Sequence, residues 1–492
     1  MLLYNTLTRR KESFEPLSPG KVGLYACGIT AYDDCHVGHA RSSVFFEVLV
    51  RYLRRRGFAV TWVRNYTDID DKILNRAKQE NAPWDEVAAR YIASFEEDMA
   101  ALGIPPAQIE PKATEHIPEM LELIRRLEEK GFAYQARPGG DVYFRVRRYS
   151  GYGRLSGQSL EDLEAGARVE VDEAKEDPLD FVLWKASKPD EPAWDSPWGP
   201  GRPGWHIECS AMSMKYLGET LDIHGGGRDL IFPHHENERA QSEAATGKPF
   251  ARFWVHHGLI TIDREKMSKS LGNFFTIKEV LAKFPAEVVR LFLINSHYRS
   301  PLDFSDAALA EAEAALIRLY TPLAKMEELL RTHPAPGGPP PPDFAPAMLT
   351  TLEMERLRTL TARFDDALDD DVNTAQALGY LFDAVRLTNR LLESPSSEPP
   401  YLALLGHLHQ QFLELGHVLN LLQADPQEML TTLRQKPWEL AISPEEIEEL
   451  IARRAVARKH KDWATADAIR QELANKGILL EDTPQGTVWR MK

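Results

Sequence analysis

The sequence is short of cysteine. Only three of its 492 residues are cysteines, at positions 27, 35 and 209. Secreted domains that depend on disulfides carry a denser and usually even set, so this scarcity argues against a disulfide framework and indicates a reducing compartment. We therefore expect a cytoplasmic protein.

Long apolar runs and an excess of basic charge are also absent. No run of 18 uncharged apolar residues occurs, which argues against a membrane-spanning helix, and MLLYNTLTRRKESF at the start becomes charged too early for a signal peptide. The net charge of −15 argues against nonspecific binding of nucleic acid by the whole surface. It allows a local basic face, because the field depends on how the charges are distributed.

A strand, a helix and a second strand are predicted near the N-terminus. KVGLYACGIT (21–30) alternates as a strand does, apolar residues recur at helical spacing from about 36 to 56, and FAVTWV (58–63) reads as another strand. This order is typical of parallel strands joined by a crossover helix. FWVHHGLITI (253–262) predicts a later strand of the same sheet. The fold class is therefore α/β, with a Rossmann-type parallel-sheet catalytic domain.

A chain of this length is too long for one core. HPAPGGPPPPDFAP (333–346) excludes helix and strand and predicts a stiff linker. The predicted parts are a split catalytic domain at 1–110 and 196–295, a connective insertion at 111–195, a helical connection at 296–332, the linker, a helical bundle at 347–425 and a small C-terminal domain at 426–492 that ends in a hairpin.

The stretch HGGGRDLIFPHHENE (224–238) is dense in glycine and charge, so we expect it to lie outside any packed core. If Pro233 starts a helix, His234 and Glu238 lie one turn apart on one face. With Cys27 and Cys209, which we expect beside similar loops, they form a donor set suited to tetrahedral Zn²⁺. The alternatives are inert buried thiols and a surface ion pair, and Cys35 is a rival ligand.

Two further motifs suit a nucleotide. HVGH (36–39) follows the first strand, where a helix N-terminus attracts phosphate and Gly38 permits close approach of a ligand. Its two histidines are alternatively helix caps. REKMSKSLGN (264–273) offers Lys266 and Lys269 to a pyrophosphate whose charge grows as its bond breaks. The alternative is a solvated loop with ordinary lysines.

These motifs carry a resemblance to a known family. HVGH resembles the HIGH motif of class I aminoacyl-tRNA synthetases, with Val for Ile, and KMSKS (266–270) matches their second motif. Further stretches are similar to cysteinyl-tRNA synthetases specifically: CGITAYD, RNYTDIDDKI, GWHIECSAM, HGGGRDLIFPHHENE and DREKMSKSLGN. The resemblance runs from NTLTR near the start to DTPQGTVWR at the end.

The resemblance implies one zinc ion per chain, held by Cys27, Cys209, His234 and Glu238, with Cys35 left as a structural thiol. Zinc in this family binds the thiolate of substrate L-cysteine. Shape alone separates near-isosteres such as serine poorly, whereas zinc prefers soft sulfur and lowers the thiol pKa. We therefore expect accuracy without editing and no hydrolytic role for the insertion at 111–195.

Other roles follow from the same resemblance. The cysteine carboxylate attacks the α-phosphate of ATP, with Mg²⁺ on the phosphates, to give cysteinyl-AMP and pyrophosphate, and catalysis is by positioning and electrostatic stabilisation. His36, His39, Lys266 and Lys269 are the expected catalytic residues, and Lys269 also holds the leaving pyrophosphate. Gly226, Gly227 and Asp229 are expected at the adenosine. Gly28, Thr67, Trp205 and His224 are expected around the substrate cysteine, although Trp205 is alternatively a core aromatic residue.

The C-terminal half is expected to bind tRNA-Cys, and the family implies a monomer. ARRAVARKHKDW (452–463) is the densest basic segment, and Trp463 or Trp489 is a candidate to stack on an anticodon base. The alternative is a solvated face paired with the glutamates at 445, 446, 448 and 449. Transfer of cysteine to an amino sugar and a catalytically inactive tRNA-binding relative are the competing functions; the long C-terminal region argues against the first and the intact motifs argue against the second.

Overall fold

The computed structural model describes the chain except residues 163–174, 263–264, 267–273, 437–442, 484–485 and 492. The chain divides into two compact units. The first comprises residues 1–277, 293–304 and 365–377, and the second comprises 278–292, 305–364 and 378–492. Residues 296–304 and 365–377 therefore pack with the first unit, although the sequence placed them within the helical connection and the bundle.

A four-stranded parallel sheet forms the centre of the first unit, in the order β10-β9-β3-β4. Its strands are β3 (Lys21–Thr30), β4 (Ala59–Thr67), β9 (Leu221–Gly227) and β10 (Ala251–His257). Helix α1 (Val37–Arg55) crosses from β3 to β4. The predicted strand–helix–strand unit and its parallel pairing are confirmed.

The strand predicted at 253–262 is wrong as a single element. β10 ends at His257, and β11 (Ile260–Ile262) pairs instead with β12 (Glu265–Lys266) and β13 (Leu302–Asp303) in a separate sheet. The break follows from hydrogen bonding, because Gly258 N–H donates to the Tyr298 carbonyl at 2.7 Å.

The expectation that HGGG lies outside the core is also wrong. His224 to Gly227 form the end of β9, and every residue of this strand is buried. The glycines contribute backbone that pairs with neighbouring strands, for example Gly225 with Ala26 of β3 and with Val255 of β10. A glycine-rich segment can therefore be central in a sheet when strands cover both of its edges.

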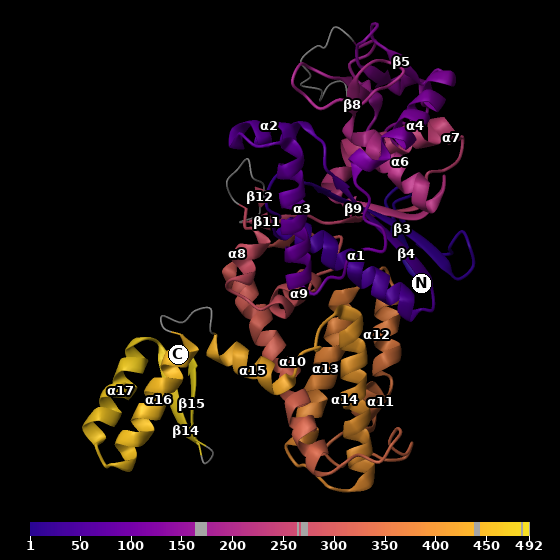
Figure 1. Ribbon diagram of the computed structural model, residues 1–492. Helices are drawn as coiled ribbons and strands as arrows, with labels where there is room; N and C mark the ends of the chain where they lie inside the picture. The colour runs from indigo at the N-terminus through magenta and orange to yellow at the C-terminus, as the bar shows by residue number, and fades with distance from the viewer. Residues whose placement is uncertain (163–174, 263–264, 267–273, 437–442, 484–485, 492) are drawn as a thin grey trace. The chain divides into compact units, whose positions relative to one another are not determined.

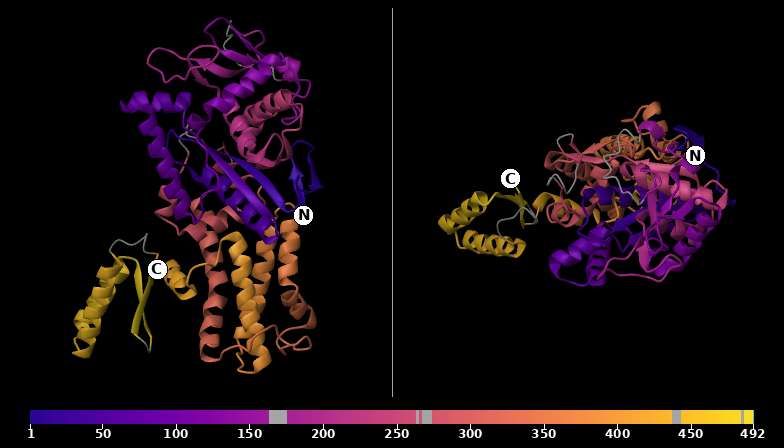
Figure 2. Two further views of the ribbon diagram at one scale, coloured as in Figure 1. Left: turned by 45° about the vertical axis from the view of Figure 1, so that its right-hand side comes forward. Right: turned by 90° about the horizontal axis from the view of Figure 1, so that it is seen from above.

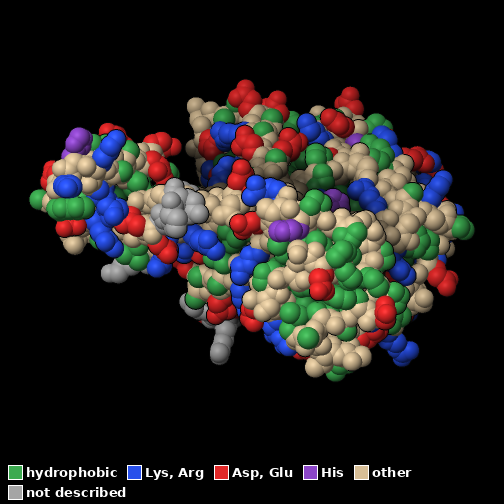
Figure 3. Space-filling model, turned by 90° about the horizontal axis from the view of Figure 1, so that it is seen from below, with side chains coloured by type: hydrophobic (Ala, Val, Ile, Leu, Met, Phe, Trp, Pro, Cys, Tyr) green, Lys and Arg blue, Asp and Glu red, His purple; other side chains and the backbone are tan. Residues whose placement is uncertain are grey.

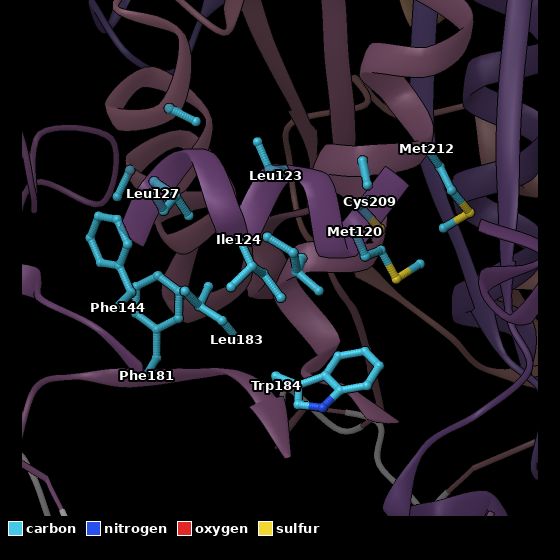
Figure 4. Close-up of a cluster of buried hydrophobic side chains, with 14 of the residues drawn as sticks. Met120, Leu123, Ile124, Leu127, Phe144, Phe181, Leu183, Trp184, Cys209 and Met212 are labelled. Carbon is cyan, nitrogen blue, oxygen red and sulfur yellow. The ribbon is translucent and has the colours of Figure 1, made fainter. Parts of the chain in front are cut away.

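The insertion is a small antiparallel sheet against helices. Its elements are α4 (Ile117–Glu129), β5 (Ala133–Gln135), β6 (Val142–Phe144), β7 (Phe181–Ala186) and β8 (Gly201–Pro203), and the last lies beyond the predicted end at 195. Helix α6 (Trp205–Leu217) follows at once. In the core of Figure 4, Met120 of α4 and Trp184 of β7 are buried with Cys209 and Met212 of α6. The insertion thus supports the helix that carries one predicted zinc ligand.

Further elements of the first unit surround the sheet: β1 (Leu2–Asn5), β2 (Arg10–Ser13), α2 (Asp71–Glu80), α3 (Trp84–Ala101) and α7 (Glu236–Thr246). Short helical turns lie at Ala113–His116, Val146–Arg148, Arg228–Leu230 and Ile231–His235. Among the described residues, no helix is both long and apolar enough to cross a bilayer.

The remaining helices run down the second half of the chain: α8 (Ile277–Leu281), α9 (Ala286–Ile294), α10 (Asp306–Thr332), α11 (Thr351–Arg358), α12 (Leu360–Asp369), α13 (Thr374–Leu392), α14 (Pro399–Leu419) and α15 (Pro426–Gln435). The predicted helical runs are confirmed, and residues 333–346 contain neither helix nor strand. The C-terminal part pairs α16 (Pro444–Lys459) with α17 (Trp463–Asn475) beside the predicted hairpin, β14 (Ile478–Thr483) and β15 (Gly486–Met491).

Candidate active site and metal centre

A cleft of about 510 Å³ opens at the carboxyl ends of the parallel strands. The chain leaves β3 toward β4 on one side, while β9 lies on the other, so the cleft sits where the strand order reverses. Ligands of open α/β sheets bind at such points. Seven predicted site residues line this cleft together: Cys27, Gly28, His36, His39, Trp205, Gly227 and Asp229.

The four predicted metal ligands meet at the edge of this cleft. Their donor atoms lie within 4.8 Å of one another: Cys27, Cys209, His234 and Glu238. Cys27 Sγ is 3.8 Å from Cys209 Sγ and 3.7 Å from Glu238 Oε1. His234 Nε2 is 3.0 Å from Glu238 Oε1. Cys27 comes from β3, the strand predicted at 21–30, and Cys209 comes from α6.

The spacing of these donors fits a tetrahedral zinc site. Zinc–sulfur bonds of about 2.3 Å place two sulfurs about 3.8 Å apart, and a sulfur and an oxygen about 3.5 Å apart. The sulfur–sulfur and sulfur–oxygen distances here are 3.8 and 3.7 Å. The donor chemistry also fits, because two thiols, an imidazole and a carboxylate are common zinc ligands.

Burial sets the protonation of this cluster. Loss of solvent raises the pKa of Glu238 above its usual value and lowers the pKa of His234 well below its usual value. Burial also raises the pKa of the Cys27 thiol, and the neighbouring Cys209 adds to this effect. The apo cluster therefore favours uncharged groups, and only a bound cation reverses this preference.

A second overlapping donor set replaces Cys209 and His234 by His224 and His235. Ligating histidines usually hold their second ring nitrogen in a hydrogen bond. His234 meets this condition, because its Nδ1 lies 2.9 Å from His206 Nδ1. The buried Nδ1 of His224 has no hydrogen-bond partner among the described residues, while its Nε2 lies 3.0 Å from Glu238 Oε2. The set with two thiols is therefore the better metal site.

Histidines that the sequence did not single out surround this cluster. His235 Nε2 lies 3.3 Å from Cys27 Sγ, and its Nδ1 lies 2.7 Å from His256 Nε2. His256 in turn bonds to Thr6 Oγ1 at 2.8 Å. The adjacent histidine pairs in FPHHENE and FWVHH could have indicated these residues from the sequence. These side chains fix ring orientations behind the ligands.

The predicted helix start at Pro233 needs correction. Residues Ile231–His235 form one wide helical turn, with non-helical dihedrals at Phe232, and α7 begins at Glu236. His234 and Glu238 nevertheless remain one turn apart, and both are almost fully buried. The alternative of a surface ion pair is therefore wrong.

Both histidines of HVGH cap helix α1. His36 Nδ1 accepts from Gly38 N–H at 3.1 Å, His39 Nδ1 accepts from His36 N–H at 3.2 Å, and the two rings stack with centroids 4.0 Å apart. The capping alternative is confirmed. It is compatible with phosphate binding, because both side chains also line the cleft beside the helix N-terminus.

The predicted cysteine pocket divides into two layers. Trp205 lines the cleft and stacks on His234 with ring centroids 4.0 Å apart. Thr67 and His224 are buried and do not line the cleft: Thr67 Oγ1 bonds to Glu208 Oε2 at 2.8 Å, and His224 lies behind Glu238. Gly226, the remaining adenosine residue, is buried in β9.

The KMSKS motif lies almost wholly outside the described residues. Lys269 belongs to the undescribed part, and the backbone of Lys266 in β12 pairs with that of Thr261 in β11. Cys35, the rival ligand, is buried and belongs to neither metal set among the described residues.

Comparison with known proteins gives a consistent assignment. A family model for the class I (C) catalytic domain of tRNA synthetases matches residues 13–314, and models of a DALR domain and a cysteinyl-tRNA ligase anticodon binding domain match 363–423 and 443–490. The cysteine–tRNA ligase of Geobacter metallireducens is 56% identical over 491 residues, which cover 100% of this chain and 99% of the relative. That of Thermodesulfovibrio yellowstonii is 52% identical over 494 residues and 100% of both chains.

The chain belongs to the cysteine–tRNA ligase family. Solved structures agree on the fold. Methionyl-tRNA synthetase of Mycobacterium tuberculosis in complex with methionyl-adenylate has a TM-score of 0.63 and 17% identity, over 84% of this chain and 94% of that one. The resemblance inferred from the motifs and the class I fold are both confirmed.

The two tryptophans proposed to stack on a base differ in exposure within the part matched by the anticodon-binding model. Trp463 is 58% exposed at the start of α17. Trp489 is 5% exposed, lies in the core of this part and donates from Nε1 to Glu448 Oε1 at 2.8 Å. The suggestion that Trp489 stacks on a base is therefore wrong for this conformation.

Part of the positive charge of segment 452–463 is neutralised by Asp482, an acidic residue that the sequence analysis did not name as a partner. Arg454 is buried and forms two hydrogen bonds to the Asp482 carboxylate, and Arg458 Nη1 lies 2.9 Å from the same group. The remaining basic side chains are exposed at Arg453, Lys459 and Lys461. Figure 3 shows basic and acidic side chains interspersed on this part.

Proposed function

We propose that the chain activates L-cysteine with ATP and transfers it to the 3′ end of tRNA-Cys, as a cytoplasmic, monomeric cysteine–tRNA ligase. The observation that carries this proposal is a single cleft that has the HVGH helix start on one side and the four-ligand cluster on the other. A phosphate site and a sulfur site that share one cleft suit an adenylate of a thiol amino acid.

The phosphate side of the cleft holds ATP. His36 and His39 stand at the N-terminus of α1 and donate hydrogen bonds to the phosphates. Lys266 and Lys269 stabilise the leaving pyrophosphate, and Mg²⁺ accompanies the nucleotide. Gly226 and Gly227 allow the adenosine to approach the end of β9, where Asp229 accepts from the ribose hydroxyls.

The sulfur side of the cleft holds cysteine. Cys27, Cys209, His234 and Glu238 would hold a zinc ion, which would supply a Lewis acid that favours a thiolate over a serine hydroxyl. Trp205 and Gly28 line this end, and Trp205 packs on the ring of His234. Thr67 and His224 act from behind: Thr67 holds Glu208, and His224 orients the Glu238 carboxylate through its second oxygen.

The experiment that tests this proposal is ATP–pyrophosphate exchange. We expect exchange with cysteine and not with serine, and a fall of at least about 100-fold after zinc is removed by a chelator, because loss of even outer-shell support costs 10–100-fold at metal sites. Zinc added back should restore the rate. Absence of exchange by the zinc-loaded protein would favour the catalytically inactive, tRNA-binding alternative.

The exposed Trp463 supports an anticodon contact. Stacking of a base on an aromatic ring is worth about 1–3 kcal/mol, so Trp463→Ala should raise the KM for tRNA-Cys by roughly 5- to 150-fold. Cysteine-dependent exchange without tRNA should stay unchanged. The matched control is Val488→Ala, another exposed apolar residue of this part. A tRNA KM unaffected by Trp463→Ala would remove this residue from the interface.

A further inference from the structure

Arg41 is a buried cation in the helix that carries HVGH. It follows His39 by two residues in α1, and its side chain lines the cleft although the residue is only 2% exposed. Burial lowers the pKa of Arg41 to about 10, so the guanidinium remains charged at neutral pH. A buried charge is retained only where strong contacts offset its desolvation.

The contacts of Arg41 go to main-chain carbonyls of two other segments. Nη1 donates to the Leu259 carbonyl at 3.3 Å, and Nη2 donates to the carbonyls of Tyr298 and Ser300. Leu259 lies between β10 and β11, and the other two residues precede β13. One guanidinium therefore ties the HVGH helix to both segments.

The segment that Arg41 holds forms a wall of the proposed nucleotide site. Residues His257 to Ile260 line the same cleft as His36 and His39. The chain then passes through β11 and β12 into the KMSKS motif. Backbone hydrogen bonds also join this wall to residues 298–302: Gly258 N–H donates to the Tyr298 carbonyl, and Leu302 N–H donates to the Leu259 carbonyl.

The contact between the wall at residues 257–260 and the segment at residues 298–300 is closely packed, so small shifts disturb it. A Cβ on Gly258 would lie 2.3 Å from the Ser300 carbonyl oxygen, so these two segments touch backbone to backbone. The Tyr298 ring also stacks on Phe45 of α1, with centroids 4.2 Å apart. Without the guanidinium, the Leu259, Tyr298 and Ser300 carbonyls would lose their donor from α1, and α1 would be held less closely to this wall.

We infer that Arg41 is a positioning residue for the ATP site, which fixes the His257–Ile260 wall at a set distance from the HVGH helix. Arginine suits this place because its planar fork reaches several carbonyls in fixed directions, whereas lysine offers one mobile point of charge. The inference rests on the proposed assignment of this cleft to ATP.

The test compares the ATP and cysteine dependence of pyrophosphate exchange. Because misplacement of a binding group by about 1 Å can cost about 100-fold, Arg41→Gln should raise the KM for ATP roughly 10-fold or more and lower kcat. The KM for cysteine and the zinc content should stay within about twofold. Arg41→Lys keeps the charge and should still raise the KM for ATP several-fold.

Two further variants make the test specific. Gly258→Ala leaves residue 41 unchanged but displaces the Ser300 carbonyl that accepts from Arg41, and it should reproduce the ATP-selective defect. Arg54→Gln makes the same substitution at an exposed position of α1 and should leave both KM values unchanged. If Arg41→Gln fails to fold, Arg41→Lys and Gly258→Ala decide the matter, and unchanged KM values for ATP in both would overturn the inference.

His39→Ala separates failure of this inference from failure of the proposed function. If His39→Ala strongly reduces exchange while Arg41→Gln and Arg41→Lys do not alter the KM for ATP, only the role of Arg41 is lost. If His39→Ala also leaves the ATP dependence unchanged, the cleft is not the ATP site and the proposed function fails there. Equal loss of ATP affinity, cysteine affinity and zinc in Arg41→Gln would indicate a general structural role and overturn the inference.

Discussion

Cys209→Ser should lose its zinc and at least about 100-fold in cysteine activation. The hydroxyl that replaces the thiol is a hard, poorly acidic donor, whereas zinc selects thiolate. Removal of a direct ligand should exceed the 10–100-fold cost of losing an outer-shell partner. Zinc per chain, measured by atomic absorption, and cysteine-dependent pyrophosphate exchange check the expectation together.

Cys35→Ser is the matched control for this substitution. Cys35 is also a buried cysteine, but it belongs to neither metal set among the described residues. It should keep one zinc per chain. If Cys209→Ser kept full zinc while Cys35→Ser lost it, the donor set would be wrong. His224→Ala sharpens the choice between the overlapping sets: it should retain most of its zinc, whereas His234→Ala should not.

Local patterns predicted those parts of the fold whose signals lie within one segment. The alternation in 21–30 predicted β3, and the helical spacing after it predicted α1. Because a helix between two strands is typical of parallel strands, the same pattern predicted that β3 pairs in parallel with β4. The spacing of His234 and Glu238 placed them together even though α7 begins later than predicted. This prediction survives an error in the helix start, because residues four apart lie on the same face wherever the helix begins.

Signals that depend on distant partners were missed. The sequence HGGG reads as exposed because glycine and histidine favour loops, but β9 is buried by β3, some 200 residues earlier, and by β10. His206 and His256 were overlooked for the same reason, since each belongs to a different element and gains meaning only when the fold brings it to the ligands. Trp463 and Trp489 looked equivalent until packing buried the second.

Gly28→Ala should disable the site through the backbone. Gly28 follows Cys27 in β3, and its N–H donates to Asn65 Oδ1 at 3.0 Å. A Cβ at this position would lie 1.7 Å from the Asn65 carbonyl oxygen, which belongs to the main chain of β4 and has no flexible side chain to yield. The end of β3 must therefore shift, and Cys27 shifts with it away from Cys209 and Glu238.

The expected result is weaker zinc binding together with a loss of roughly 100-fold in cysteine activation, since displacement of a binding group by about 1 Å has that effect. Overpacking of this kind also costs about 1–3 kcal/mol of unfolding free energy, which a thermal melt of the zinc-free protein measures separately. Gly23→Ala is the matched control in the same strand, because its Cβ would meet side-chain atoms and no backbone: Leu217 at 3.3 Å and Asp222 Oδ2 at 3.7 Å. A folded Gly28→Ala protein with normal zinc content and exchange would show that the metal cluster tolerates a displaced strand end, and the tight coupling of β3 and β4 would then have no part in catalysis.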